Sequence, residues 1–254
     1  MFISAAIITH NEARDIERCL NSLIGVVDEI IGVDAFSTDG TVDICRRYGA
    51  LVTSRRFDGY GSQRQYAAGL THGRYVLSID ADEILTDDLR RNIIALKQEG
   101  FTHRMYAFKV VHFICGRPMR DSGMKPDIQT RLFDKRYASW NLLDVDERIT
   151  YPGSVNPFVI GGEMHHYRCR DFDELAFKEL RNAELRGRVL AAAGINAPAP
   201  MGWFRAACAF VHCHLRQRAF LDGNSGRKIA ALRYKTTLAA YQKARKIAME
   251  GVGK

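Results

Sequence analysis

The stretch VLSIDADEIL, Val76 to Leu85, decides the fold and raises the first chemical question. An apolar run typical of a buried strand leads directly into three acids, Asp80, Asp82 and Glu83. Like charges this close together repel one another unless a positive group lies among them. In sheets of alternating strands and helices, ligands bind beyond the carboxyl ends of the strands. Other strands of such a sheet should therefore end in polar residues at the same edge.

Strand-like and helix-like segments alternate ahead of this stretch. The predicted strands are FISAAIIT (2–9), EIIGVD (29–34), LVTS (51–54) and YVLSID (75–80). Between them we expect a helix capped by Asn11, a second helix closed by Gly49 and a third from Gly61 to Leu70. Nearly continuous apolar strands alternating with helices predict an α/β fold with a mostly parallel, Rossmann-like sheet covered by helices on both faces.

The pattern changes after residue 100. A helix capped by Thr86 is followed by residues 105–167, which resemble further strands joined by long loops. From Asp171 onward the periodicity is helical, interrupted by INAPAPMG. We therefore expect a nucleotide-binding and catalytic domain over residues 1–167 and a helical C-terminal extension over residues 168–254.

The net charge of +8 is concentrated in the predicted extension. Residues 1–167 hold 20 Lys and Arg against 22 Asp and Glu, a net of −2, whereas residues 168–254 hold 17 against 7, a net of +10. Basic helices with apolar faces are typical of proteins that lie on an anionic membrane surface. Packing against the catalytic domain or against a second copy in a homodimer is the alternative.

Compartment signals point to the cytoplasm. No run of eighteen uncharged apolar residues occurs, and no basic segment precedes the short apolar N-terminus. The six cysteines are widely spaced without a CxxC pair, so a disulfide framework is not expected. These features predict a cytoplasmic protein, peripheral on the inner face of the cytoplasmic membrane.

Three predicted strands end in acids or amides, which indicates one site. Asp80 and Asp82 follow the fourth strand, Asp34 ends the second, and residues 9–12 end the first. Carboxylates can hold a diphosphate only if a cation lies between them, and Mg²⁺ or Mn²⁺ commonly uses one or two protein carboxylates with phosphate oxygens. The alternative is that Asp82 and its neighbours form a solvated turn and helix start.

Four motifs occur here in the order and spacing of glycosyltransferase family two, whose enzymes have the GT-A fold. They are IITHNE (7–12), VDAFSTDGT (33–41), GYGSQRQY (59–66) and SIDADE (78–83). Four later segments resemble the inner-core β-1,4-glucosyltransferases of lipopolysaccharide, namely PDIQTRLF (126–133), DERI (146–149), MHHY (164–167) and FLDGNSGRKIAAL (220–232). The resemblance covers nearly the whole chain.

The resemblance implies a role for each matching position on the donor side. The residues expected around the nucleotide of a UDP-sugar are Thr9, Asn11, Glu12, Asp34, Gln63, Arg64, Asp80 and Arg131. Asp34 resembles the acid that reads the uracil edge, and Asp80 the acid near the ribose. The alternatives are helix caps for Thr9, Glu12 and Asp34, and a helix surface for Gln63 and Arg64, where Gln65 replaces the usual Asn of the family's Q-x-N.

The metal and the base are assigned from the same resemblance. Asp82 matches the metal ligand that reaches the diphosphate, and His166 would complete the metal shell or hold the wall of the site; a structural histidine is the alternative. Asp127 and Gln129 are further candidates from PDIQTRLF. Inverting transfer needs a base for the acceptor hydroxyl, and that base is expected at Glu147 with Asp146 as substitute; a surface acid paired with Arg148 is the alternative.

The expected activity is metal-dependent, inverting transfer of a hexose, glucose from UDP-glucose, to a lipopolysaccharide-core or lipid-linked saccharide. A sugar-nucleotide nucleotidyltransferase would share the parallel sheet and the metal-binding acid, but no glycine-rich basic loop follows the first strand, where THNEARD stands. A noncatalytic nucleic-acid-binding protein would explain the basic extension but not the acids. The extension contains no recognised nucleic-acid motif.

Overall fold

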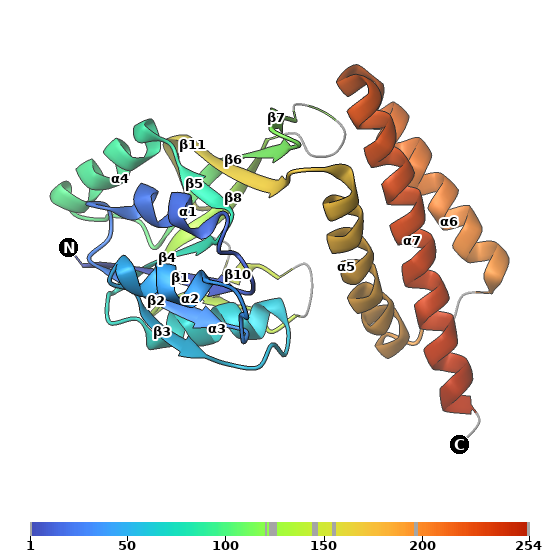
Figure 1. Cartoon of the computed structure of the whole chain (residues 1–254), viewed down its shortest axis with the longest axis horizontal. Coiled ribbons are helices and arrows are strands. Elements are labelled where there is room, and N and C mark those ends of the chain that lie inside the picture. Colours follow the sequence, from blue (N-terminus) through green and yellow to red (C-terminus); the bar gives the residue numbers. More distant parts are fainter. Residues whose placement is uncertain are drawn as a thin grey trace. The chain divides into compact units, whose positions relative to one another are not determined.

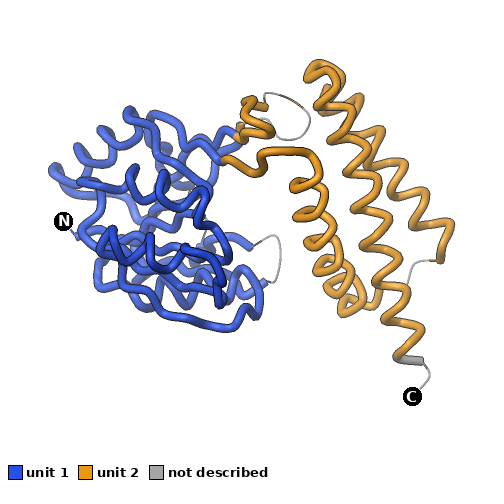
Figure 2. The backbone as a smooth tube through the Cα atoms, in the orientation of Figure 1, with its two compact units in different colours: residues 1–111, 127–166 blue, residues 112–126, 167–254 orange. Residues whose placement is uncertain are grey.

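The computed structural model describes residues 2–119, 121, 126–143, 147–153, 156–195 and 198–252. The chain separates into two compact units, which Figure 2 shows in blue and orange. Unit 1 comprises residues 1–111 and 127–166, and unit 2 comprises residues 112–126 and 167–254. Unit 2 therefore includes a segment, 112–126, that the sequence places within the first domain.

One half of the large sheet is parallel (Figure 1). Its strands are β1 (Ile3–Thr9), β2 (Glu29–Asp34), β3 (Leu51–Ser54) and β4 (Tyr75–Asp80). They lie in the order β3-β2-β1-β4, and every neighbouring pair is parallel. This is the arrangement that the alternating apolar runs predict.

The other half of the sheet contains antiparallel pairs. Its strands are β5 (Glu83–Leu85), β6 (Met105–Ile114), β7 (Arg117–Pro118), β8 (Asp127–Asp134) and β11 (Phe158–Cys169). The order continues from β4 as β8-β6-β11-β5, with β7 paired to β6. Strand β8 is antiparallel to both β4 and β6, and β5 is antiparallel to β11. Contacts between β6 and β11 advance together along the two strands, from Lys109 with Glu163 to Cys115 with Cys169, as they do between parallel neighbours. The α/β class is confirmed, with a sheet that is mixed.

Four helices belong to unit 1: α1 (Ile16–Leu23), α2 (Thr41–Arg47), α3 (Tyr60–Leu70) and α4 (Asp87–Glu99). The Thr86 hydroxyl accepts a hydrogen bond from the Leu89 amide, as its predicted capping role requires. The predicted cap at Asn11 is wrong. Helix α1 starts at Ile16, and its N-cap residue, Asp15, makes no side-chain cap bond, while the Asn11 side chain bonds the Thr38 amide instead.

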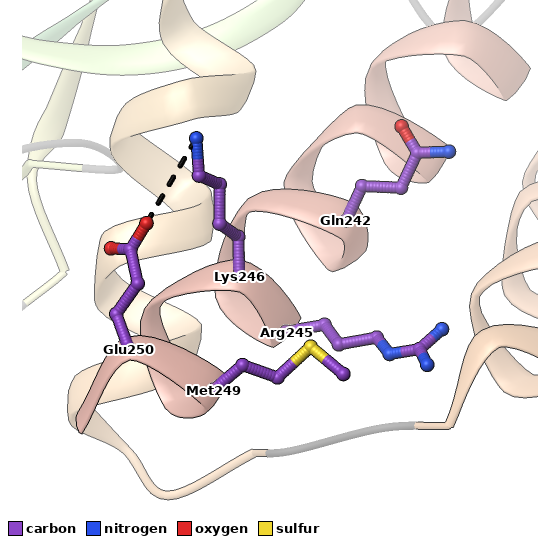
Figure 3. A pocket seen from close by; sticks show the side chains of 5 residues that line it. All are labelled: Gln242, Arg245, Lys246, Met249 and Glu250. Atoms are coloured by element: carbon purple, nitrogen blue, oxygen red, sulfur yellow. Dashed lines mark ion pairs between the residues drawn. The ribbon is translucent and has the colours of Figure 1, made fainter. Parts of the chain in front are cut away.

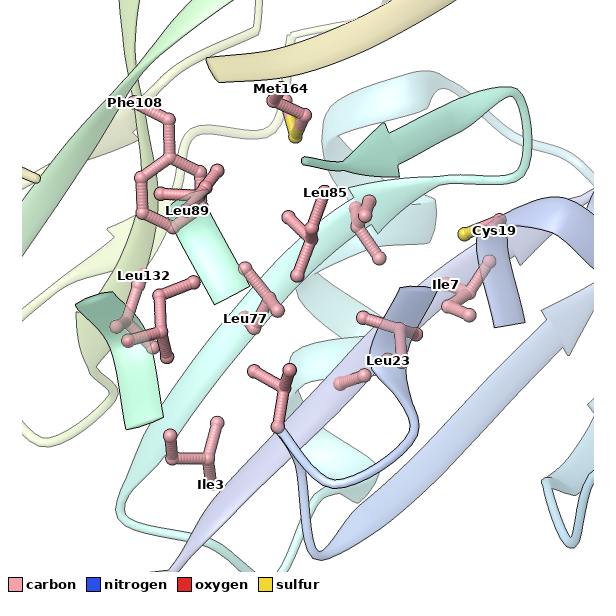
Figure 4. Close-up of a cluster of buried hydrophobic side chains, with 14 of the residues drawn as sticks. Ile3, Ile7, Cys19, Leu23, Leu77, Leu85, Leu89, Phe108, Leu132 and Met164 are labelled. Atoms are coloured by element: carbon pink, nitrogen blue, oxygen red, sulfur yellow. The ribbon is translucent and has the colours of Figure 1, made fainter. Parts of the chain in front are cut away.

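The core of unit 1 lies along β1 and β4. Ile3 and Ile7 of β1 and Leu77 of β4 are fully or almost fully buried, and Figure 4 shows them among the side chains of this cluster. Burying each such side chain contributes about 1.5–3 kcal/mol. The two strands are thereby fixed along their length, and so are the residues at which they end.

Unit 2 is mainly helical, as predicted. Its helices are α5 (Phe172–Ala192), α6 (Ala199–Val211), the π-helical turn η1 (His212–Arg216), the 3-10 turn η2 (Ala219–Asp222) and α7 (Gly223–Val252). Helix α7 packs against both α5 and α6. Glycines allow the close approach, since a Cβ on Gly187 would lie 2.6 Å from Lys243 and one on Gly202 would lie 3.2 Å from Tyr241.

Two surface features of unit 2 bear on its role. Among the described residues, no helix is both long enough and apolar enough to cross a bilayer. A hollow of about 420 Å³ near the end of α7 is lined by Gln242, Arg245, Lys246, Met249 and Glu250 (Figure 3). Its single acid, Glu250, lies 3.9 Å from the Lys246 ammonium. None of the predicted site residues lines this hollow.

Candidate active site

The carboxyl ends of β1, β2 and β4 lie level with one another. Thr9 of β1 is in register with Asp34 of β2, and Ile8 is in register with Asp80 of β4. The Thr9 hydroxyl donates a hydrogen bond of 2.9 Å to the Asp34 carboxylate. The structure therefore brings polar residues that are far apart in the sequence to one edge of the sheet.

Asp34 is almost completely buried and is held by neutral donors. Its Oδ1 accepts hydrogen bonds from the hydroxyls of Thr9 and Ser37, at 2.9 and 2.5 Å, and its Oδ2 accepts one from the Ser37 amide at 2.8 Å. A carboxylate has about four acceptor positions. One acceptor position is left, so a ligand could donate a single hydrogen bond to Asp34.

The loops after β1 and β2 are joined by hydrogen bonds. The Asn11 amide donates to Ser37 Oγ, and Asn11 Oδ1 accepts from the Thr38 amide, both at 2.8 Å. The Glu12 amide donates to Thr41 Oγ1 at 2.8 Å, while the Glu12 carbonyl accepts the amide of Ile16 at the start of α1. Asn11 and Glu12 thus hold the two loops in one arrangement beside Asp34.

Arg64 of α3 connects two of the predicted acids. Its Nη2 donates to both carboxylate oxygens of Asp80, at 2.8 and 2.7 Å, and its Nη1 donates to Glu147. The guanidinium carbon lies 4.9 Å from the centre of the Trp140 ring. Arg64 is therefore held on two sides, and the acid expected near the ribose is joined through it to the expected base.

The charges in this group keep one another ionised. Burial raises the pKa of the Asp80 carboxyl, but the guanidiniums of Arg64 and Arg131 outweigh it and lower that pKa below its ordinary value. Burial lowers the pKa of the Arg64 guanidinium, and the carboxylates of Asp80 and Glu147 more than reverse this, so the pKa is raised. Both groups are charged at neutral pH.

Glu83 is fully buried and connects three strands. Its Oε1 accepts a hydrogen bond of 2.5 Å from Arg131 Nη2 on β8, and its Oε2 accepts the Asp80 amide at 2.9 Å. It is also in register with His166 of β11, whose Nδ1 lies 3.7 Å from Oε1. Burial raises the pKa of Glu83, and Arg131 opposes the shift only in part.

Asp82 and His166 lie side by side at the same edge. His166 Nε2 is 3.3 Å from Asp82 Oδ2, and each side chain is about one-sixth exposed, at 15% and 16%. Two ligands on neighbouring corners of an octahedral Mg²⁺ site are about 3.0 Å apart, given metal–ligand distances near 2.1 Å. The pair therefore fits two positions on one ion. In the described part of the chain, no group of three or more His, Cys, Asp or Glu side chains could hold a metal.

Glu147 lies in a segment that contacts the start of α3. The short strands β9 (Ser139–Trp140) and β10 (Ile149–Thr150) pair on either side of it. The Gly61 amide donates to the Leu143 carbonyl at 3.0 Å, and a Cβ on Gly61 would lie 2.1 Å from the Asn141 carbonyl oxygen. Only glycine allows this approach. Asp146, the predicted substitute base, lies outside the described residues.

Other predicted residues lie apart from the acids. Gln63 is buried, and its Oε1 accepts a hydrogen bond of 3.1 Å from Arg55. On β8, Gln129 Nε2 donates to Asp127 at 3.0 Å, and Asp127 is exposed, whereas Arg131 on the same strand is buried. The structure thus brings Arg64 and Arg131 to the acids, whereas the hydrogen bonds given for Gln63 and Gln129 join them to Arg55 and Asp127.

Sequence reasoning missed Glu83. It was left without a role beside Asp80 and Asp82, yet it is the most buried acid of the three. A signal was present: in the stretch Glu83–Leu85, alternation places Glu83 on the same face of a strand as the apolar Leu85. Arg64 lies over the ring of Trp140. No sequence pattern could have predicted this contact, because the two residues come from distant segments of the chain.

The chain is similar to several known proteins. Residues 4–150 match Glycosyl transferase family 2. An uncharacterised glycosyltransferase from Rickettsia felis is 31% identical over 69% of this chain and 65% of its own length, so the match spans slightly less than two thirds of that relative. The lipopolysaccharide core biosynthesis glycosyltransferase LpsC from Rhizobium meliloti is 28% identical over 72% of this chain and 70% of its own.

Solved structures with related folds were also found. Staphylococcus aureus TarS, residues 1–349 in complex with UDP, matches with a TM-score of 0.48 at 14% identity, over 99% of this chain and 92% of that chain. Glucosyl-3-phosphoglycerate synthase from Mycobacterium tuberculosis, with Mn²⁺, UDP and glucosyl-3-phosphoglycerate, matches at 0.35 and 28% identity over 44% of each chain. Since the family match covers more than half of its residues, the chain belongs to glycosyl transferase family 2.

Proposed function

We propose that the chain is a metal-dependent, inverting glycosyltransferase that moves glucose from UDP-glucose to a lipopolysaccharide-core or lipid-linked saccharide. The convergence of acids and arginines at the strand ends carries the proposal. The acids are Asp80, Asp82, Glu83 and Glu147, and the arginines are Arg64 and Arg131. Two formal negative charges remain after pairing, and one divalent cation balances them.

Asp82 and His166 would hold Mg²⁺ or Mn²⁺ through Oδ2 and Nε2, which lie 3.3 Å apart. Two protein ligands suit an ion that takes its other ligands from phosphate oxygens and water. When bound, such an ion offsets the negative charge on the departing diphosphate. Arg131 lies 3.8 Å from Asp80 and is aimed by Glu83, so its forked guanidinium would add a second positive charge on that side.

Glu147 would act as the base. The acceptor oxygen forms a bond to the anomeric carbon as that carbon's bond to the diphosphate breaks, and the hydroxyl proton passes to the Glu147 carboxylate. Attack from the face opposite the diphosphate inverts the configuration. Arg64 would orient the carboxylate, since it already bonds Glu147 and Asp80 together. Asp146 is the alternative base.

The nucleoside would lie at the ends of β1 and β2. Asp34 retains one acceptor position after bonding Thr9 and Ser37, and a single N–H, such as that of the uracil imide, would fill it. Asn11 and Glu12 would shape the loop around the base. Asp80 would accept a hydrogen bond from a ribose hydroxyl. Gln63 would hold the Arg55 side chain beside helix α3.

The acceptor proposal has a separate source. LpsC, the Rhizobium meliloti relative, is by name a glycosyltransferase of lipopolysaccharide core biosynthesis, and its similarity supports a core saccharide as acceptor for this chain. Glucose as the donor sugar rests on the sequence resemblance alone.

The full chain should be tested by calorimetry with UDP, with and without Mn²⁺, and then by hydrolysis of several sugar nucleotides. We expect UDP to bind far more tightly with Mn²⁺ present and UDP-glucose to be hydrolysed fastest. Absence of metal-dependent UDP binding would sink the proposal and favour a nucleic-acid-binding protein. Release of pyrophosphate from UTP and a sugar phosphate would instead identify a nucleotidyltransferase.

Helix α6 supports attachment to the inner face of the cytoplasmic membrane. Phe204, Val211 and Leu215 recur along one side of the helical segment and are 63%, 51% and 61% exposed, whereas Gly202 and Ala206 are buried on the opposite side. No acid occurs between Glu184 and Asp222, and five arginines do. An exposed apolar stripe with only positive neighbours matches an anionic lipid surface.

Vesicle sedimentation would test this attachment. The chain should bind vesicles that contain anionic lipid and not neutral ones, and Phe204→Ser with Val211→Ser should release it. Leu51→Ser, equally exposed at 61% on β3, is the matched control and should still bind. If the stripe joins two copies instead, the double variant would turn a dimer into a monomer without changing vesicle binding.

A further inference from the structure

Phe36 adopts a backbone conformation that its residue type disfavours. Its φ is 58°, in the left-handed region where a Cβ approaches the carbonyl oxygen. Asn11 on the neighbouring loop has a φ of 56°, but asparagine tolerates this region, whereas a bulky aromatic residue there is an outlier. Such outliers persist only where the surroundings impose them, and they cluster at functional sites.

Burial does not compensate for this strain. The Phe36 side chain is 61% exposed, although phenylalanine stabilises a fold mainly by leaving water. Leu51 is as exposed, but it lies in a regular strand without backbone strain. Phe36 therefore combines a strained backbone with a ring that contributes little to stability.

The residues on either side of Phe36 hold the strain in place. The Ala35 amide donates to the Thr9 carbonyl at 2.8 Å, and the Ala35 carbonyl lies 2.8 Å from His10 Nδ1. On the other side, the Ser37 amide donates to Asp34 at 2.8 Å. The chain is thus bonded at both flanks of Phe36, while the Phe36 side chain itself stays largely exposed.

We propose that Phe36 stacks on the nucleobase of the donor. The inference rests on the proposed function and adds a residue that recognises the face of the base, beside the acid that reads its edge. A flat apolar ring two residues along the chain from Asp34, a carboxylate with one acceptor position left, offers both contacts that a base requires, stacking and a directed hydrogen bond. Stacking on an aromatic side chain tolerates any base, so Asp34 would supply the selectivity.

The test compares the ligands UDP and inorganic pyrophosphate, each with Mn²⁺, by calorimetry on the full chain. Phe36→Gly should weaken UDP by about ten-fold and leave pyrophosphate unchanged, because only UDP carries a base. Phe36→Tyr should restore UDP affinity. The ratio of the two affinities does not depend on the fraction of folded protein, so it stays valid if a variant is partly unfolded.

Thermal unfolding provides an independent readout. Phe36→Gly removes the strain and should raise the unfolding midpoint by roughly 2 °C while affinity falls, a combination that a structural role would not produce. Arg218→Gly, at a φ of 55° in unit 2, is the matched control: its midpoint should rise and its UDP affinity should not change.

Two results would overturn the assignment. One is a Phe36→Gly variant whose UDP affinity stays within about two-fold of the parent; the other is an equal loss for UDP and pyrophosphate. Failure of the parent chain to bind UDP would overturn the proposed function as well, so the two failures are distinguishable.

Discussion

Each end of β4 carries an aspartate held by arginine. At the carboxyl end, Asp80 accepts two hydrogen bonds from Arg64. At the amino end, Asp134 of β8 lies beside the first residue of the strand and accepts hydrogen bonds from Arg74 and Arg136, at 2.7 to 3.0 Å. Both aspartates have a lowered pKa, and in each case arginine outweighs the effect of burial. The local chemistry is nearly the same.

The two ends of β4 differ in how deeply the arginines are buried and in the net charge of the cluster. The Arg64 side chain is 11% exposed, whereas those of Arg74 and Arg136 are 42% and 52% exposed. At the amino end, two arginines in contact with water surround one acid. At the carboxyl end, Asp80, Glu83 and Glu147 pair with two buried arginines, and a fourth acid, Asp82, lies beside His166. A cluster of acids and arginines therefore indicates a ligand-binding site only where it is buried and keeps a net charge that no other protein group balances.

The largest expected effect is on turnover. Glu147→Gln removes the proposed base but keeps the shape and the bond to Arg64, so kcat should fall by about 10³-fold while UDP affinity with Mn²⁺ is retained. Steady-state kinetics and calorimetry would measure both. The matched control is Glu163→Gln, an acid paired with Lys109 on the surface, which should keep normal turnover. Retained turnover in Glu147→Gln would move the base to Asp146.

The second largest expected effect is on stability, when the Arg64 guanidinium is removed. Arg64→Met leaves Asp80 and Glu147 buried without their partner, and breaking a buried pair in this way should lower the free energy of unfolding by about 3 kcal/mol. Arg74→Met is the counterpart at the amino end, where Asp134 is equally buried but keeps two hydrogen bonds from Arg136, so a loss of about 1 kcal/mol is expected. Equal losses in urea unfolding would remove the distinction between the two ends.

Metal affinity provides the third test. Asp82→Asn should weaken Mn²⁺-dependent UDP binding by at least about 100-fold, or 2.7 kcal/mol, and leave metal-free UDP binding unchanged. Asp87→Asn, at an exposed acid in the first turn of α4, should bind as the parent does. Titration with Mn²⁺ at fixed UDP would separate them, and a normal Mn²⁺ requirement in Asp82→Asn would exclude Asp82 as a ligand.

The smallest effect concerns acid stability at the amino end. The pKa of Asp134 is lowered from 3.8, since the bonds from Arg136 and Arg74 outweigh burial. The ionised carboxylate therefore contributes its full stability above pH 3.8, and this contribution is lost as pH falls through the lower, folded pKa. Asp134→Asn should cost about 2 kcal/mol at pH 7 and progressively less below pH 4. A difference that stays constant down to pH 3 in urea unfolding would contradict this.

Much of the fold could be predicted because β1 to β4 are local patterns. Their apolar runs match the observed strands within a residue, and Gly49, with a φ of 77°, ends α2 as expected. The other half, from β8 to β5, was only outlined, since no short-range signal fixes which strands β8 and β11 lie beside. The cap at Asn11 failed for a similar reason: the side chain found a tertiary partner in Thr38.

The site shows the same division. The acids after β1, β2 and β4 could be located because they directly follow predicted strands. The groups that hold them could not, because Arg64, Arg131 and Glu147 meet only once α3, β8 and the segment between β9 and β10 are assembled. The repulsion between the three crowded acids is therefore relieved in a way that the sequence does not reveal, because two arginines lie among them without any metal.

Gly61 gives the site an evolutionary vulnerability. Changing a glycine codon to an alanine codon takes one base, and the added methyl group would meet the Asn141 carbonyl at 2.1 Å and displace the segment that leads to Glu147. Every acid, arginine and histidine of the strand ends would be retained in such a descendant. Under the proposed function, its lineage would keep the residues assigned to the sugar nucleotide and lose the placement of the proposed base, so one inherited step would turn a transferase into a nucleotide-sugar binder.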